Sequence, residues 1–181
     1  MTARFLQAMV SVFLHEGGYS DIKEDSGGKT NYGVSLAFLK GLGKKGDINK
    51  DGAVDGGDIR VLTKEQANQI YWDNFWIPLY DKLPARLGMK VFDVAVNAGS
   101  SRAHKLLQKT LNLLGAKLGE DGIIGGATLA EVAKYSEAQL VETYCKAQAN
   151  FYRALVAKKP TNARFLEGWL HRAAWVPKTI A

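Results

Sequence analysis

One glutamate and the polar segment after it carry the residue types that acid-catalysed bond cleavage needs. Glu16 ends an apolar stretch, and the glycine-rich loop that follows contains Asp25 and Thr30. A glutamate with apolar helix neighbours is partly desolvated, which would raise its pKa and suit a general acid. Two carboxyls that flank a bond, one protonated and one ionised, are the equipment of glycoside hydrolysis. We therefore predict Glu16 as the acid, with Asp25 and Thr30 placed to hold or activate a water. Asp21 and Glu24 are alternatives to Asp25 as the second carboxylate.

Aromatic and amide side chains occur in the same segment. Tyr19, Asn31 and Tyr32 lie within sixteen residues of Glu16. Aromatic faces and amide groups suit the two sides of a pyranose ring, so these three residues are candidate sugar contacts. The alternative is that they pack the loop onto the body of the protein.

A second polar segment has the spacing of a cation-binding loop. Residues 47–58 fit the twelve-residue calcium loop, with a glycine, Gly52, at its sixth position. The predicted oxygen ligands are the side chains of Asp47, Asn49, Asp51, Asp55 and Asp58 and the backbone carbonyl of Ala53. Asp58 stands where an EF-hand uses a longer glutamate, which should weaken or alter coordination. We expect a structural Ca²⁺ here and no cofactor for catalysis. The alternative is a solvated acidic turn.

The elements that must position these residues are mostly helices. Apolar spacing predicts a helix over residues 3–16, and a glycine-rich segment of turns, loops or a short β-hairpin follows over 17–35. A helical piece near 35–42 precedes the acidic loop. Helices are then predicted over 87–98, 101–114, 128–135, from 137 onward and over 162–175. Thr63 and Ser136 each begin a capping box. The fold class is mainly α, with a small irregular or hairpin lobe after the first helix.

Composition limits the classes of protein that fit. The chain has 181 residues, one cysteine and a net charge of +6. That length suits one compact unit, and a lone Cys145 allows no internal disulfide. The three histidines lack metal-ligand spacing, which disfavours a zinc amidase. No nucleic-acid motif accompanies the basic charge, so nucleic acid is not an expected partner.

No apolar run is long enough to insert in a membrane. The N-terminus reads as an amphipathic helix and not as a signal peptide. We therefore expect synthesis in the cytoplasm; if the protein acts outside it, another factor must export it.

The glycine-rich segment resembles a known signature. Glu16-Gly-Gly-Tyr19, an acidic stretch, Gly-Gly and Thr30-Asn-Tyr-Gly-Val34 are similar to the phage-type N-acetylmuramidases of glycoside hydrolase family 108, which include endolysins and secretion-activator proteins. Residues 92–99, 107–108 and 121–129 resemble that family's C-terminal peptidoglycan-binding region, and 168–172 its closing motif. The resemblance implies a lysozyme-like fold, peptidoglycan as substrate and Glu16 as the catalytic glutamate. With the absence of a predicted signal peptide, it also implies action on the cell wall in the periplasm and an export factor such as a holin or a secretion system. It also implies that Asp93 and Asn97, four residues apart on one helix face, line the cleft. A buried polar pair is the alternative for these two.

On this basis residues 1–90 are expected to be catalytic, and residues 91–181 to form a helical peptidoglycan-binding region packed into the same unit. The predicted activity is cleavage of the β-1,4 bond between N-acetylmuramic acid and N-acetylglucosamine. Two alternatives stay open: a lytic transglycosylase acting on the same bond, and a non-catalytic wall-binding protein that assists secretion.

Overall fold

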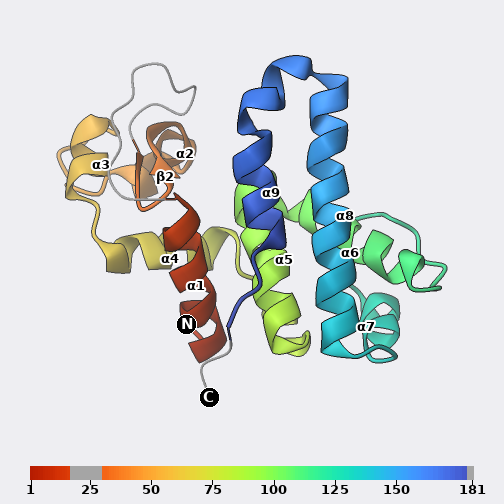
Figure 1. Cartoon of the computed structure of the whole chain (residues 1–181). Coiled ribbons are helices and arrows are strands. Elements are labelled where there is room, and N and C mark those ends of the chain that lie inside the picture. Colours follow the sequence, from red (N-terminus) through yellow and green to blue (C-terminus); the bar gives the residue numbers. More distant parts are fainter. Residues whose placement is uncertain (17–29, 179–181) are drawn as a thin grey trace. The chain divides into compact units, whose positions relative to one another are not determined.

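The computed structural model describes residues 1–16 and 30–178 (Figure 1). Within these ranges the chain forms nine α-helices, three short 3-10 helices and one two-stranded sheet. The mainly α, lysozyme-like fold class with a small hairpin lobe is confirmed. By proximity of its residues the chain divides into two compact units, one made of Met1 and residues 9–74 and the other of residues 2–8 and 75–181.

The first unit holds the elements of the N-terminal half. Most of α1 (Ala3–Glu16) belongs to it, and its bounds match the predicted helix. β1 (Thr30–Asn31) and β2 (Val34–Ser35) form an antiparallel hairpin, followed by α2 (Leu36–Gly41), η1 (Gly43–Gly46), α3 (Gly56–Val61) and α4 (Lys64–Asn74). The buried side chains of this unit include Met9, Val12, Val34, Leu39, Ile59 and Tyr71.

One helix of this unit was not predicted. α3 begins inside the acidic loop, where Asp55 accepts a hydrogen bond from the Gly57 N–H, and Asp58 accepts one from the Asp55 N–H. This reciprocal capping box supplies acceptors for backbone donors that a helix start leaves unpaired. The residues predicted as the end of a cation loop therefore also begin a helix.

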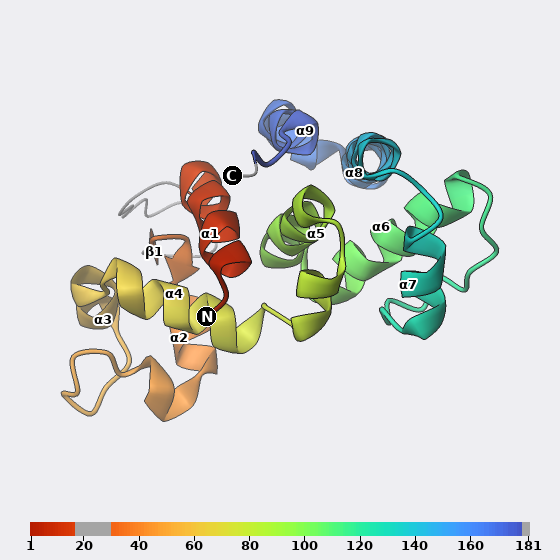
Figure 2. The same cartoon turned by 90° about the horizontal axis from the view of Figure 1, so that it is seen from below.

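The second unit is a helical assembly. It contains η2 (Pro78–Lys82), α5 (Ala85–Ala98), α6 (Ser100–Leu113), α7 (Gly126–Val132), α8 (Glu137–Lys158), η3 (Pro160–Phe165) and α9 (Leu166–Ala174). Figure 1 shows α8 and α9 running side by side in opposite directions, and Figure 2 shows α5 and α6 beneath them. The predicted break at Gly99 is confirmed: its φ of 91° is unfavourable for a residue with a side chain and separates α5 from α6.

Aromatic packing fills the centre of the second unit. The rings of Phe5, Trp76, Tyr80 and Phe92 meet edge to face, with centroids 5.0–6.2 Å apart. Arg4 donates to the backbone carbonyls of Tyr80, Asp81 and Leu83 and so holds the start of α1 against η2. No helix in the part of the chain that the structure describes is long and apolar enough to cross a bilayer.

Candidate functional site

The predicted acid lies at the end of a helix. Glu16 is the last residue of α1, as the sequence pattern indicated. Tyr19 and Asp25 fall in residues 17–29, outside the described residues. The described parts of the site are the backbone end of α1 and the hairpin of β1 and β2.

The hairpin turn packs against the last turn of α1. The rings of Phe13 and Tyr32 meet edge to face with centroids 5.5 Å apart, and the Lys64 ammonium lies 5.4 Å from the centre of the Phe13 ring. Glu16 follows Phe13 by three residues, so the two positions fall on one side of the helix. This contact brings the hairpin that carries Thr30, the first residue of β1, to the helix turn that carries Glu16.

The turn has an uncommon backbone conformation. Tyr32 and Gly33 join the two strands with φ of 51° and 75°. A two-residue hairpin turn favours positive φ at both places, but Asn, Asp or Gly usually stands where Tyr32 does. The left-handed conformation costs a residue with a side chain roughly 1–2 kcal/mol. The Tyr71 hydroxyl, which donates to the Tyr32 carbonyl at 3.2 Å, and the Phe13 ring hold it there. Such strain is typical of functional sites.

Asn31 anchors the hairpin to the C-terminal end of α3. Its side chain is 9% exposed, and its Nδ2 donates to the carbonyls of Ile59 at 3.0 Å and Leu62 at 3.3 Å. The amide donor is thus engaged at the end of α3. Sugar contact by Asn31 and Tyr32 stays a prediction, and packing is the role their geometry displays.

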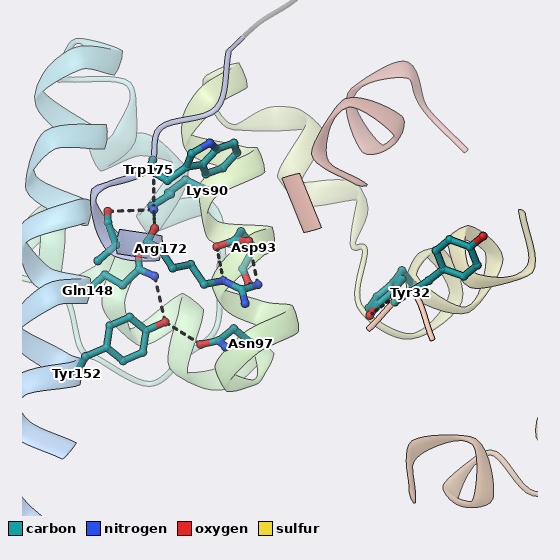
Figure 3. A network of polar contacts seen from close by, with 10 residues as sticks. Tyr32, Lys90, Asp93, Asn97, Gln148, Tyr152, Arg172 and Trp175 are labelled. Atoms are coloured by element: carbon teal, nitrogen blue, oxygen red, sulfur yellow. Dashed lines mark hydrogen bonds and ion pairs between the residues drawn. The ribbon is translucent and has the colours of Figure 1, made fainter. Parts of the chain in front are cut away.

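Asp93 lies in a buried ion pair of the second unit. Arg172 of α9 reaches it with two parallel hydrogen bonds of 3.0 Å, Nε to Oδ2 and Nη2 to Oδ1 (Figure 3). The two side chains are 1% and 8% exposed. In this conformation Asp93 offers no surface to a sugar, and we do not carry it forward as a substrate contact.

Asn97 is engaged one turn further along α5. Its Oδ1 accepts a hydrogen bond of 2.7 Å from the Tyr152 hydroxyl, which in turn accepts one of 3.1 Å from Gln148 (Figure 3). The predicted pair thus joins α5 to α8 and α9. Substrate contact by Asn97 remains a prediction.

A lysine that sequence reasoning missed completes this network. Lys90 is fully buried, and its ammonium donates to the carbonyls of Arg172, Ala173 and Trp175 at 2.6–3.1 Å (Figure 3). Burial lowers the pKa of Lys90, and nearby Cys145 and Asp93 oppose that shift. The lysine caps the C-terminal end of α9, where carbonyls lack helical partners. A signal existed in the sequence, because Lys90 and Asp93 are the two charged residues of the otherwise apolar segment 87–96.

The loop over 47–58 is folded around its own backbone. The N–H of Asp51 lies 3.1 Å from Asp47 Oδ1 and 3.0 Å from Asn49 Oδ1, so these oxygens meet at one turn. Asp58 is buried, with the N–H groups of Ile48, Asn49 and Asp55 on its two oxygens at 2.7–3.1 Å. Burial would raise the pKa of Asp58, but these three hydrogen bonds outweigh it and lower the pKa.

The donor set therefore fits a cation only in part. Asp47, Asn49 and Asp51 offer oxygens close together, as Ca²⁺ prefers. Asp58, at the twelfth position, is committed to backbone donors. Among the side chains that the structure describes, those of residues 1–15 and 30–178, no group of three or more His, Cys, Asp or Glu is placed to hold a metal ion.

The comparisons with known proteins agree with this architecture. The family profile described as glycosyl hydrolase 108 matches residues 9–99, and one described as a predicted peptidoglycan domain matches residues 102–174. The chain is also similar to SagA of Brucella abortus, with a TM-score of 0.73 and 34% sequence identity over 94% of this chain and 89% of that one. No curated protein matches it.

Fold and profiles together define a peptidoglycan-acting glycosidase, with a glycosidase region followed by a peptidoglycan region. The chain belongs to the glycosyl hydrolase 108 family.

Proposed function

We propose that this protein hydrolyses the β-1,4 bond between N-acetylmuramic acid and N-acetylglucosamine, with Glu16 as the general acid. The observation that carries the proposal is the packing of Tyr32 on Phe13, which brings the hairpin to the end of the helix where Glu16 lies. Membership of a glycosidase family and the peptidoglycan region support the substrate class.

In the proposed mechanism Glu16 gives its proton to the glycosidic oxygen as the bond from that oxygen to the anomeric carbon breaks. The anomeric carbon becomes oxocarbenium-like, and a water attacks it. Asp25 takes a proton from that water, and the hydroxyl of Thr30, at the start of β1, helps to hold the water in place. Attack from the face opposite to the leaving group inverts the anomeric configuration. That geometry needs the two carboxyls about 6.5–9.5 Å apart.

The hairpin supplies the proposed walls of the sugar site. Tyr32 is half-buried, and its backbone is held by the hydrogen bond from the Tyr71 hydroxyl. A fixed aromatic ring binds a sugar with little loss of side-chain entropy. Tyr19 and Asn31 are proposed as further contacts.

A structural calcium ion in the 47–58 loop is also proposed. The oxygens of Asp47, Asn49 and Asp51 support it, and Asp58 serves the fold of the loop. A bound ion would stiffen the connection between η1 and α3 and takes no part in the hydrolysis.

Product analysis tests the proposed reaction. Purified peptidoglycan is digested with the protein, and the soluble fragments are separated and weighed by mass spectrometry, with and without borohydride reduction. Hydrolysis predicts N-acetylmuramic acid at a reducing end that borohydride converts. Products that end in 1,6-anhydro-muramic acid would assign a lytic transglycosylase instead. Intact peptidoglycan to which the protein binds would assign a wall-binding protein without activity.

A further inference from the structure

The positive charge of the chain is concentrated in its peptidoglycan region. Residues 102–174 contain 11 Lys and Arg against 6 Asp and Glu, a net of +5 out of +6 for the whole chain. The glycosidase half is therefore close to neutral. Attraction to an anionic partner belongs mainly to the second unit.

Three of these basic residues line a groove of about 280 Å³ between α6 and α8. Arg102, Lys105 and Lys109 stand along one side of α6, at spacings of three and four residues that align side chains on a helix face. All three are exposed. Over seven residues the helix rises about 10 Å, so the row offers cations at several points of an extended ligand.

Most of the positive charge of this row is not neutralised by ion pairs. Within the described residues no ion pair holds Lys105 or Lys109, whereas Lys134 and Lys146 of the same region pair with Glu131 and Glu142. Arg102 donates to the Ala98 carbonyl, a neutral partner. The carboxylates nearby are those of Glu120, which lines the groove, and Asp121, whose pKa is lowered chiefly by a hydrogen bond from Gln108 and least by Lys105.

The floor of the groove is apolar and its helices are held firmly. Leu106 is 6% exposed and Phe151 is half-buried, and both line the groove. Gln108 bonds the backbone of Gly122 and Ile123, and the Tyr144 hydroxyl donates to the Ala103 carbonyl. The cations therefore project from a helix that is fixed on two sides.

We propose that this groove binds the carboxylate-bearing peptide stems of peptidoglycan. The inference rests on the proposed function only for the identity of the polymer. In intact peptidoglycan the lactyl carboxyl of muramic acid is consumed in the amide bond to the peptide, so the glycan is neutral and the free carboxylates belong to the stems. A cationic wall over an apolar floor matches carboxylates beside alanine methyls and an aliphatic diamino acid. A neutral sugar would leave these cations unpaired.

The first test measures binding to purified sacculi by co-sedimentation, in a Glu16→Gln background to prevent digestion. Lys105→Gln with Lys109→Gln removes two groove charges. Lys158→Gln with Lys159→Gln removes two exposed charges of the same region, outside the groove, and is the matched control. We expect the groove pair to weaken binding at least about fivefold and to reduce its salt dependence, and the control to change it less than about twofold. Equal losses in the two pairs would overturn the proposal.

The second test identifies the ligand with defined probes. Amide resonances of the full-length protein are followed by NMR during titration with a soluble tetrapeptide stem, with the same peptide amidated at its carboxyls, and with N-acetylglucosamine oligomers, which are neutral glycans without a lactyl carboxylate. We expect the acidic peptide alone to shift residues of α6 and α8 around the groove. Shifts there from the neutral glycan, or equal shifts from the acidic and the amidated peptide, would refute the proposal. Because neither test measures bond cleavage, a failed groove and a failed hydrolase are distinguishable.

Discussion

Removal of the Arg172 guanidinium is the sharpest test of the buried network around Asp93. Arg172→Met keeps most of the volume and the apolar stem but removes the two 3.0 Å hydrogen bonds to a carboxylate that is 1% exposed. Taking one partner from a buried pair costs about 3–5 kcal/mol, because the other charge stays desolvated. At an m-value of about 1–3 kcal/mol per molar urea, the unfolding midpoint should fall by at least about 1 M.

Tryptophan fluorescence during urea unfolding follows this loss. Trp76, Trp169 and Trp175 belong to the second unit, and Trp72 to the first, so the signal mainly reports the unit that holds the pair. The double variant Asp93→Ala with Arg172→Met removes both charges and should recover at least half of the stability. If Arg172→Met unfolds at the wild-type midpoint, the account of the pair is wrong. If Arg172→Met keeps its stability but loses substrate binding, Asp93 would again be a candidate substrate contact.

Three further predictions concern other parts of the chain. Lys90→Met removes the donor to three carbonyls at the end of α9 and should lower stability by about 2–3 kcal/mol in the same urea assay; an unchanged midpoint would remove the capping role. Burial lowers the pKa of His104 below 6.5 despite its hydrogen bond with the Gly122 carbonyl, so the folded state binds fewer protons. The stability that the neutral His104 gives to the folded state is fully present above about pH 6.5. It is lost as the pH falls toward the lower pKa that His104 has in the folded state. His104→Gln should flatten the dependence of stability on pH between 7 and 5, and an unaltered slope would contradict this. Calcium should raise the melting temperature relative to EDTA in the wild type but not in the double variant Asp47→Ala with Asp51→Ala. Identical melting curves of the wild type with calcium and with EDTA would refute the calcium site.

Local signals accounted for most of the helices. The apolar spacing of residues 3–16 and the capping boxes at Thr63 and Ser136 all correspond to observed elements, because each depends on neighbours within one or two turns. The missed helix, α3, lies where loop and helix signals overlap. Asp55 and Asp58 fit a cation loop and a capping box equally well by type and spacing, and only the folded backbone shows the box.

Long-range contacts could not be read from the chain. The pair of Asp93 and Arg172 joins residues 79 apart, and Lys90 bonds carbonyls 82 to 85 residues away. Backbone carbonyls have no sequence signature at all. The placement of Tyr32 on Phe13 is likewise tertiary, so the sequence could name the candidate residues of the site but could not predict what holds the hairpin there.

The central claim is that Glu16 donates the proton that breaks the glycosidic bond. The most direct measurement is the rate of turbidity loss of purified cell walls with the wild type, with Glu16→Gln, and with Glu65→Gln, an exposed glutamate of α4 as the matched control. The account predicts that Glu16→Gln lowers the rate by about 10²-fold or more at unchanged melting temperature and wall binding, while Glu65→Gln retains full activity. Equal rates for the wild type and Glu16→Gln would contradict it.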